Sequence, residues 1–117
     1  MKTYRLKETT HFTKWMDKLD AQTRRRIYAR LDKACATGHF GDHHGVGGGV
    51  SEMRFDFAHG LRVYYAIMRD EVILLTLTGG DKSGQQRDIE RARALLPDAM
   101  AKVRKELEEE KKRGKTT

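Results

Sequence analysis

Residues 52–67 read EMRFDFAHGLRVYYAI, in which apolar side chains alternate with charged or polar ones on either side of Ala-His-Gly. A period of two residues is typical of β-strands, so this stretch predicts an antiparallel hairpin that turns around His59. Met53 falls on the predicted core face and Glu52 on the polar face. We expect that polar face to be open to solvent.

A further strand is predicted directly after the hairpin. Val72–Leu77 is a nearly continuous apolar run, as in strands covered on both faces, and Arg69–Glu71 suits the turn before it. Ser83 and Gln86 have the spacing of a capping box at the start of a helix. Pro97 is expected to end or kink that helix.

The chain before the hairpin predicts a short strand, Thr3–Lys7, and then two helices. The first helix is expected to bury an apolar stripe formed by Phe12, Trp15, Met16 and Leu19. Asp20 is positioned to cap the second helix, and Gly38 to end it. The glycine-rich segment from Gly38 to Gly49 is expected to be a loop. Helices followed by strands predict a single α+β domain.

Composition gives the chain a basic character. It has 117 residues, a net charge of +7 and a pI of about 9.7, which favours association with a nucleic acid, a ribosome or an acidic protein. Cys35 is the single cysteine, so no internal disulfide is expected. Neither a signal peptide nor a membrane span is indicated, and we expect a cytoplasmic protein with no membrane association.

The polar face of the hairpin carries the main candidate site, formed by Glu52, Arg54, Arg62 and Tyr64. Two arginines on adjacent strands could grip a phosphodiester and stabilise charge that develops during cleavage, with Glu52 as a base. The predicted register places Arg54 opposite Tyr64. The same register places Arg62 opposite Asp56, and an exposed cross-strand ion pair is the alternative interpretation.

A second candidate site is the strand exit Gly79-Gly80-Asp81-Lys82-Ser83. Free N–H groups and the helix dipole favour an anion there, and Lys82 would add a cation. The spacing does not match a nucleotide-binding P-loop, because Asp81 separates Gly80 from Lys82. The alternative is a tight turn with a helix cap.

Other polar clusters are weaker candidates. Arg24, Arg25 and Arg30 of the second helix could bind RNA phosphates or an acidic partner, or form a solvated face. A glycine-rich loop holds His39, Asp42, His43 and His44, but it offers no ligand geometry. We therefore expect neither a metal site nor a cofactor.

Several blocks of the sequence together resemble the RelE/ParE toxin superfamily, specifically its HigB-like "addiction module killer" branch. The blocks begin with Phe12-Thr-Lys-Trp15-Met and Arg26-Ile-Tyr-Ala-Arg30-Leu. They continue with Gly49-Val-Ser-Glu52-Met-Arg54, Gly60-Leu-Arg62-Val-Tyr64 and the segment from Leu77 to Ile89. The likeness covers about residues 3 to 96. It implies two N-terminal helices on a small curved antiparallel sheet with a C-terminal helix, a toxin domain over residues 1–97, and a charged helical extension over residues 98–117.

The resemblance also implies a function. It suggests the toxin of a type II toxin–antitoxin module that cleaves ribosome-bound mRNA without a metal. A helix-turn-helix, HigA-like antitoxin would cover its basic face. Arg54 and Arg62 match positions that bind and activate the phosphodiester, and Lys82 matches one that stabilises the transition state.

The sequence also departs from that pattern. RelE-type toxins often carry a further catalytic Tyr or His after the last strand, where this chain has Gln85-Gln86-Arg87-Asp88. ParE-like relatives poison DNA gyrase with the same fold, so a gyrase poison without nuclease chemistry is one alternative function. A non-toxic remnant that represses its operon together with the antitoxin is another.

Overall fold

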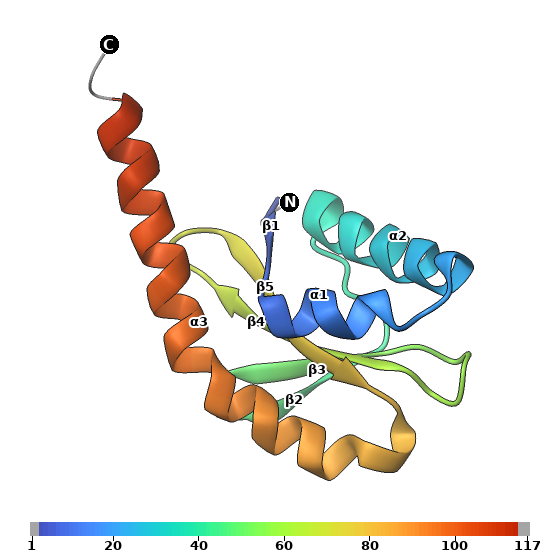
Figure 1. The fold of residues 1–117 in the computed structure, drawn as a ribbon. Helices are drawn as coiled ribbons and strands as arrows, with labels where there is room; N and C mark the ends of the chain where they lie inside the picture. Colours follow the sequence, from blue (N-terminus) through green and yellow to red (C-terminus); the bar gives the residue numbers. More distant parts are fainter. Residues whose placement is uncertain (1–2, 115–117) are drawn as a thin grey trace.

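The computed structural model describes residues 3–114, in which a five-stranded sheet lies between two short helices on one face and one long helix on the other (Figure 1). The elements in chain order are β1 (Arg5–Glu8), α1 (Thr10–Asp17), α2 (Ala21–Thr37), β2 (His43–Gly47), β3 (Val50–Arg54), β4 (Arg62–Met68), β5 (Ile73–Gly80), the 3₁₀ turn η1 (Lys82–Gly84) and α3 (Gln85–Gly114). The strand order is β1-β5-β4-β3-β2, and β1 pairs in parallel with β5 while the other neighbours are antiparallel. The predicted α+β fold, with two N-terminal helices on a sheet and a C-terminal helix, is confirmed.

Side chains cap the first two helices, and the cap predicted at Asp20 is confirmed. The Thr9 hydroxyl accepts a hydrogen bond from Phe12 N at 3.0 Å, and Asp20 Oδ1 accepts one from Thr23 N at 2.7 Å. Gly38 ends α2 with a φ of 76°, a left-handed conformation that glycine adopts without strain. Local side-chain chemistry therefore fixes these helix boundaries.

Two apolar layers hold the sheet. On one face, α1 and α2 pack on the sheet through Phe12, Met16, Ile27, Leu31, Ala34, Met53, Val63, Tyr65 and Leu74. On the other, α3 packs on it through Ile89, Ala92, Leu96, Val103, Val50, Tyr64, Ala66, Leu75 and Leu77. The expectation of an open polar face is wrong, because the apolar side of α3 covers it and encloses Glu52 and Tyr64 completely.

The hairpin pairs in a different register from the predicted one. Arg54 lies opposite Arg62, and Glu52 lies opposite Tyr64. Neither the Arg54–Tyr64 pair nor the Arg62–Asp56 pair forms, because the chain between the strands is a loop over residues 55–61 rather than a tight turn. The observed register differs from the predicted one by two residues, so the alternation stays in phase and the four side chains still lie on one side of the sheet.

The glycine-rich segment after α2 is partly a strand, so the predicted loop over Gly38–Gly49 is wrong in its second half. His43 pairs with Met53 and His44 with Glu52, which makes β2 the edge of the sheet. Gly47, Gly48 and Gly49 all have positive φ and turn the chain into β3. The loop was predicted from glycine content, but here glycine serves the turn between two strands.

Helix α3 is a single element that contains Pro97. Figure 1 shows its axis changing direction midway, as expected where a proline removes a backbone donor. The predicted cap at Ser83 is not formed; Asp81 caps η1, the turn that leads into α3, and its Oδ1 accepts from Ser83 N at 2.9 Å. No helix within residues 3–114 is long and apolar enough to cross a lipid bilayer.

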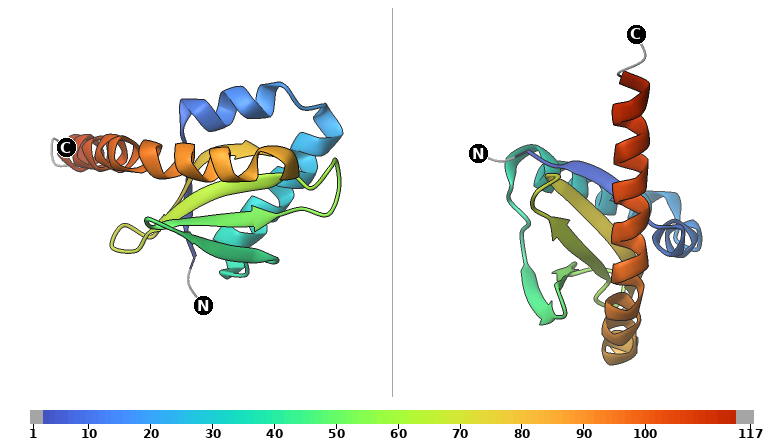
Figure 2. Two further views of the ribbon diagram at one scale, coloured as in Figure 1. Left: turned by 90° about the horizontal axis from the view of Figure 1, so that it is seen from below. Right: turned by 90° about the vertical axis from the view of Figure 1, so that its left-hand side faces the viewer.

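The second half of α3 packs along β1 and then extends beyond the sheet (Figure 2). Val103 is buried in the second apolar layer, and Leu107 packs against that layer. Ion pairs join Arg5 to Glu110 at 3.2 Å and Lys7 to Glu106 at 3.5 Å. Residues 1–2 of the predicted toxin domain and 115–117 of the predicted extension lie outside the described residues, and the division at residue 97 stays a prediction.

Candidate functional site

A buried carboxylate organises the candidate site. Glu52 of β3 has no exposed surface. Its Oε1 accepts a hydrogen bond from Arg54 Nε at 2.7 Å, and Gln85 Nε2 donates to Oε2 at 2.9 Å and to Oε1 at 3.1 Å. Arg62 Nε lies 3.6 Å from Oε2. Three neighbours from two strands and a helix therefore hold this one side chain, and no side of it is open to act as a base on a bound molecule.

The two predicted arginines do come together, but they meet on this internal carboxylate. The Arg54 side chain remains 38% exposed, whereas that of Arg62 is only 10% exposed. Among residues 3–114, the terminal nitrogens of Arg54 have no hydrogen-bond partner, and neither does the buried Nε of Arg62. Two guanidinium groups against one carboxylate leave the cluster with a net positive charge.

Lys82 joins this cluster at Gly60. Arg62 Nη1 donates to Gly60 O at 2.7 Å, and Lys82 N donates to His59 O at 3.4 Å. A Cβ atom at Gly60 would lie 3.3 Å from Arg62 Nη1 and 3.4 Å from Lys82 Cβ. The loop over residues 55–61 therefore places an arginine from β4 and a lysine from η1 around the same glycine.

An open pocket adjoins this glycine. It is lined by Asp56, His59, Gly60, Asp81, Lys82 and Ser83. The Lys82 side chain is exposed and makes no hydrogen bond or ion pair with any residue in the range 3–114. The predicted strand exit thus forms a turn and cap, and it also presents a free cation to solvent.

Two further polar groups lie beneath the cluster. Tyr64 is fully buried, and its hydroxyl has no hydrogen-bond partner within the described chain. Burial raises the pKa of Tyr64, and the nearby Glu52 raises it further. Burial also raises the pKa of Asp88, whose carboxylate lies over Gly80. A hydroxyl so enclosed is not available to a molecule in solvent.

The arginines of α2 have different environments. The guanidinium of Arg30 is bound within the protein, because it donates to Arg54 O, to Phe40 O at 3.2 Å and to Asp42 O at 2.8 Å. It also stacks over Phe55, with 4.4 Å between its central carbon and the ring centre. This group fastens the chain after α2 to the end of β3. Its predicted contact with RNA stays a prediction.

Arg24 and Arg25 differ from Arg30. Arg24 donates to Leu19 O in the turn before its helix, whereas Arg25 is exposed. Both line a shallow surface hollow on α2. Of the two guanidinium groups at this hollow, only that of Arg25 makes no hydrogen bond or ion pair within residues 3–114.

Replacing Arg30 with alanine is expected to destabilise the fold by about 2 kcal/mol or more, because three carbonyl groups lose a charged donor. Arg30→Lys should not restore stability, since an ammonium cannot reproduce the planar fork. Chemical denaturation measures both changes, and Arg25→Ala on the same helix is the control. Equal stability of the Arg30 and Arg25 variants would contradict this role for Arg30.

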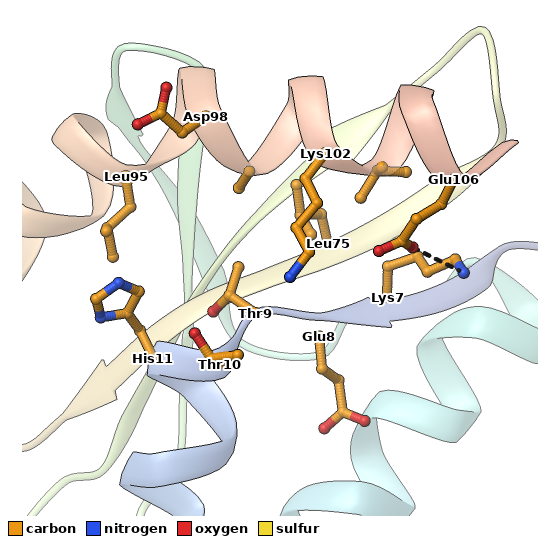
Figure 3. Close-up of a pocket in the computed structure, with 12 residues that line it drawn as sticks. Lys7, Glu8, Thr9, Thr10, His11, Leu75, Leu95, Asp98, Lys102 and Glu106 are labelled. Carbon is orange, nitrogen blue, oxygen red and sulfur yellow. Dashed lines mark hydrogen bonds and ion pairs between the residues drawn. The ribbon is translucent and has the colours of Figure 1, made fainter. Parts of the chain in front are cut away.

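Figure 3 shows a second cleft between β1, the start of α1 and the second half of α3. Lys102 points into it, and Leu95 lies near His11. It is far along the sheet from the arginines, because Lys7 pairs with Leu75 whereas Arg62 pairs with Gly80. The two cavities are separate.

The histidines between α2 and β3 do not form a metal-binding cluster. His44 Nε2 lies 3.5 Å from Asp42 Oδ1, and His43 Nδ1 lies 2.8 Å from Gly41 O. Within residues 3–114, no group of three or more His, Cys, Asp or Glu side chains could hold a metal ion.

Comparison with solved structures defines the class of fold. An arginine-to-alanine double mutant of the E. coli toxin RelE in the free state superposes with a TM-score of 0.64 at 14% identity, covering 79% of this chain and 95% of that chain. A chain of the intact E. coli RelBE toxin–antitoxin complex superposes with a TM-score of 0.59 at 16% identity, covering 68% and 96%. The domain therefore has the RelE fold.

Sequence comparison then gives the family. The family model described as phage derived protein Gp49-like matches residues 14–97. An uncharacterized protein of Haemophilus influenzae is 38% identical over 97 residues, which cover 82% of this chain and 96% of that protein. The chain belongs to the Gp49-like family, within the RelE/ParE superfamily of toxins from toxin–antitoxin modules.

Proposed function

We propose that this protein is the toxin of a type II toxin–antitoxin module, in the HigB-like branch, and that it cleaves mRNA on the ribosome. The observation that supports the proposal is the meeting of Arg62 and Lys82 at Gly60, beside an open pocket. Arg54 is the cross-strand partner of Arg62 and adds a third cation. Three cations at one end of a sheet suit a phosphodiester that gains charge during cleavage.

In this proposal the cations have different tasks. Arg54 and Arg62 are fixed by Glu52, so they would position the phosphate with little loss of side-chain freedom. Glu52 is a positioning residue rather than a base. Lys82 is exposed and would neutralise a phosphate oxygen in the transition state. The 2′-hydroxyl of the RNA attacks its own phosphate, so the products carry a 2′,3′-cyclic phosphate and a 5′-hydroxyl.

The open pocket beside Gly60 also indicates what kind of protein would bind this chain. A helix-turn-helix antitoxin with acidic side chains would cover the open pocket and keep mRNA from Lys82. The net charge of +7 favours both this antitoxin and the ribosome. The RelE fold also occurs in the solved RelBE toxin–antitoxin complex, which supports an antitoxin partner.

Expression of the protein in growing cells separates the proposed function from its alternatives. We expect growth arrest with a fall in protein synthesis and mRNA fragments cut within coding regions, as mapped by primer extension. Co-expression of the neighbouring antitoxin gene should restore growth. Intact mRNA together with gyrase-linked DNA breaks would contradict the proposal and support a gyrase poison, and normal growth would support a co-repressor.

A further inference from the structure

The loop between β3 and β4 has an unusual backbone. Ala58, His59 and Gly60 are consecutive and have φ angles of 49°, 62° and 73°. Glycine adopts this left-handed region freely, but an alanine pays a steric cost there, and such conformations are often kept at functional sites. The strain therefore makes the middle residue of this turn a candidate for a functional role.

That middle residue is a histidine that lines the open pocket. His59 shares the pocket with Asp56, Asp81, Lys82 and Ser83. Hydrogen bonds from Ser83 lower the pKa of Asp81, and the proximity of His59 lowers it slightly further. The backbone of the histidine also accepts from Lys82 N, so loop and turn are joined at this point.

His59 is exposed to solvent in this pocket, and its side chain is of a type that can donate a proton. Glu52 is enclosed by Arg54, Arg62 and Gln85, so it cannot reach a substrate. The carboxylate of Asp81 accepts from both the N–H and the hydroxyl of Ser83. Histidine is exposed here and is the side chain that exchanges a proton most readily near neutral pH.

We propose that His59 is the general acid of the cleavage reaction, an inference that rests on the proposed ribonuclease function. The 2′-oxygen forms a bond to phosphorus as the bond from phosphorus to the 5′-oxygen breaks. The proton of the 2′-hydroxyl passes to water, and the His59 imidazolium gives its proton to the departing 5′-oxygen. Solvent then reprotonates the imidazole. The loop thereby supplies an acid to the pocket that Lys82 also lines.

A substrate with a better leaving group tests this role. Purified His59→Asn protein should cleave ribosome-bound mRNA about 100-fold more slowly than the wild type, as expected when a general acid is lost. When one 5′-oxygen at the cut site is replaced by sulfur, the leaving thiolate needs no proton. The variant should then cleave within about threefold of the wild-type rate, because the general-acid contribution has been removed.

The controls separate proton transfer from structure. Asparagine tolerates the left-handed conformation, so melting temperature should not fall. His39→Asn, an exposed histidine in the segment after α2, should cleave both substrates at the wild-type rate. Normal cleavage of ordinary mRNA by the His59 variant, or equal slowing on both substrates, would overturn the inference and leave the ribonuclease proposal standing. Failure of the wild-type protein to cut either substrate would overturn both.

Discussion

Replacing Glu52 with alanine is expected to lower the free energy of unfolding by about 3–5 kcal/mol, the usual cost of removing one partner from a buried ion pair. The carboxylate is completely buried, and it is the only acidic group within 4.0 Å of the Arg62 guanidinium within residues 3–114. Without it, the guanidinium of Arg62, whose side chain is 10% exposed, keeps its charge with no counterion. Arg54 is more exposed, so its charge can be hydrated and should contribute less to the loss.

Urea denaturation with matched variants measures this effect. Glu52→Gln keeps the shape and one acceptor oxygen, so it should lose less stability than the alanine variant. Glu109→Ala, on the exposed side of α3, should change the free energy of unfolding by less than about 0.5 kcal/mol. A loss below about 1 kcal/mol for Glu52→Ala would show that the carboxylate does not organise the arginines.

Lys82→Ala is expected to slow mRNA cleavage about 100-fold, which is typical when one stabilising group is removed from a transition state. Its melting temperature should equal that of the wild type, because the side chain is exposed and contacts no other charged group in the described chain. Single-turnover cleavage of ribosome-bound mRNA gives the rate. Stability and activity are therefore separable at this position.

Two companion variants define what Lys82 contributes. Lys82→Arg keeps the positive charge and should recover much of the rate, whereas Lys33→Ala on α2 should cleave normally. An alanine variant at position 82 that cleaves as fast as the wild type would remove Lys82 from the site. Arg62 is less suitable for this purpose, because it is largely buried against Glu52 and its loss should reduce stability and activity together.

The start and end of α2 were readable from the sequence because they depend on neighbours in the chain. Thr9 and Asp20 cap helices within three residues of their own positions. The position of α3 depends instead on contacts distant in sequence. A polar row on a strand gives no sign that a helix will cover it, so the face around Glu52 was predicted to be open.

The sequence predicted which residues form the candidate site, but it did not predict how their side chains contact one another. Arg54 and Arg62 share a face because the observed register differs from the predicted one by two residues, which keeps the alternation of side chains in phase. The carboxylate that they share, Glu52, also accepts a hydrogen bond from Gln85 of α3. No pattern in the sequence indicates that Gln85 lies beside Glu52. The position of His59 beside Lys82 was not predicted either, because only the folded loop brings the two residues together.

The chemistry of the new RNA ends tests whether Arg54, Arg62 and Lys82 cleave RNA. Purified protein is mixed with ribosomes stalled on a defined mRNA, and the 3′ ends of the fragments are identified by mass spectrometry. We expect 2′,3′-cyclic phosphates with the wild-type protein and almost none with Lys82→Ala. Intact mRNA, or fragments formed equally by both proteins, would contradict the claim that these cations cleave RNA.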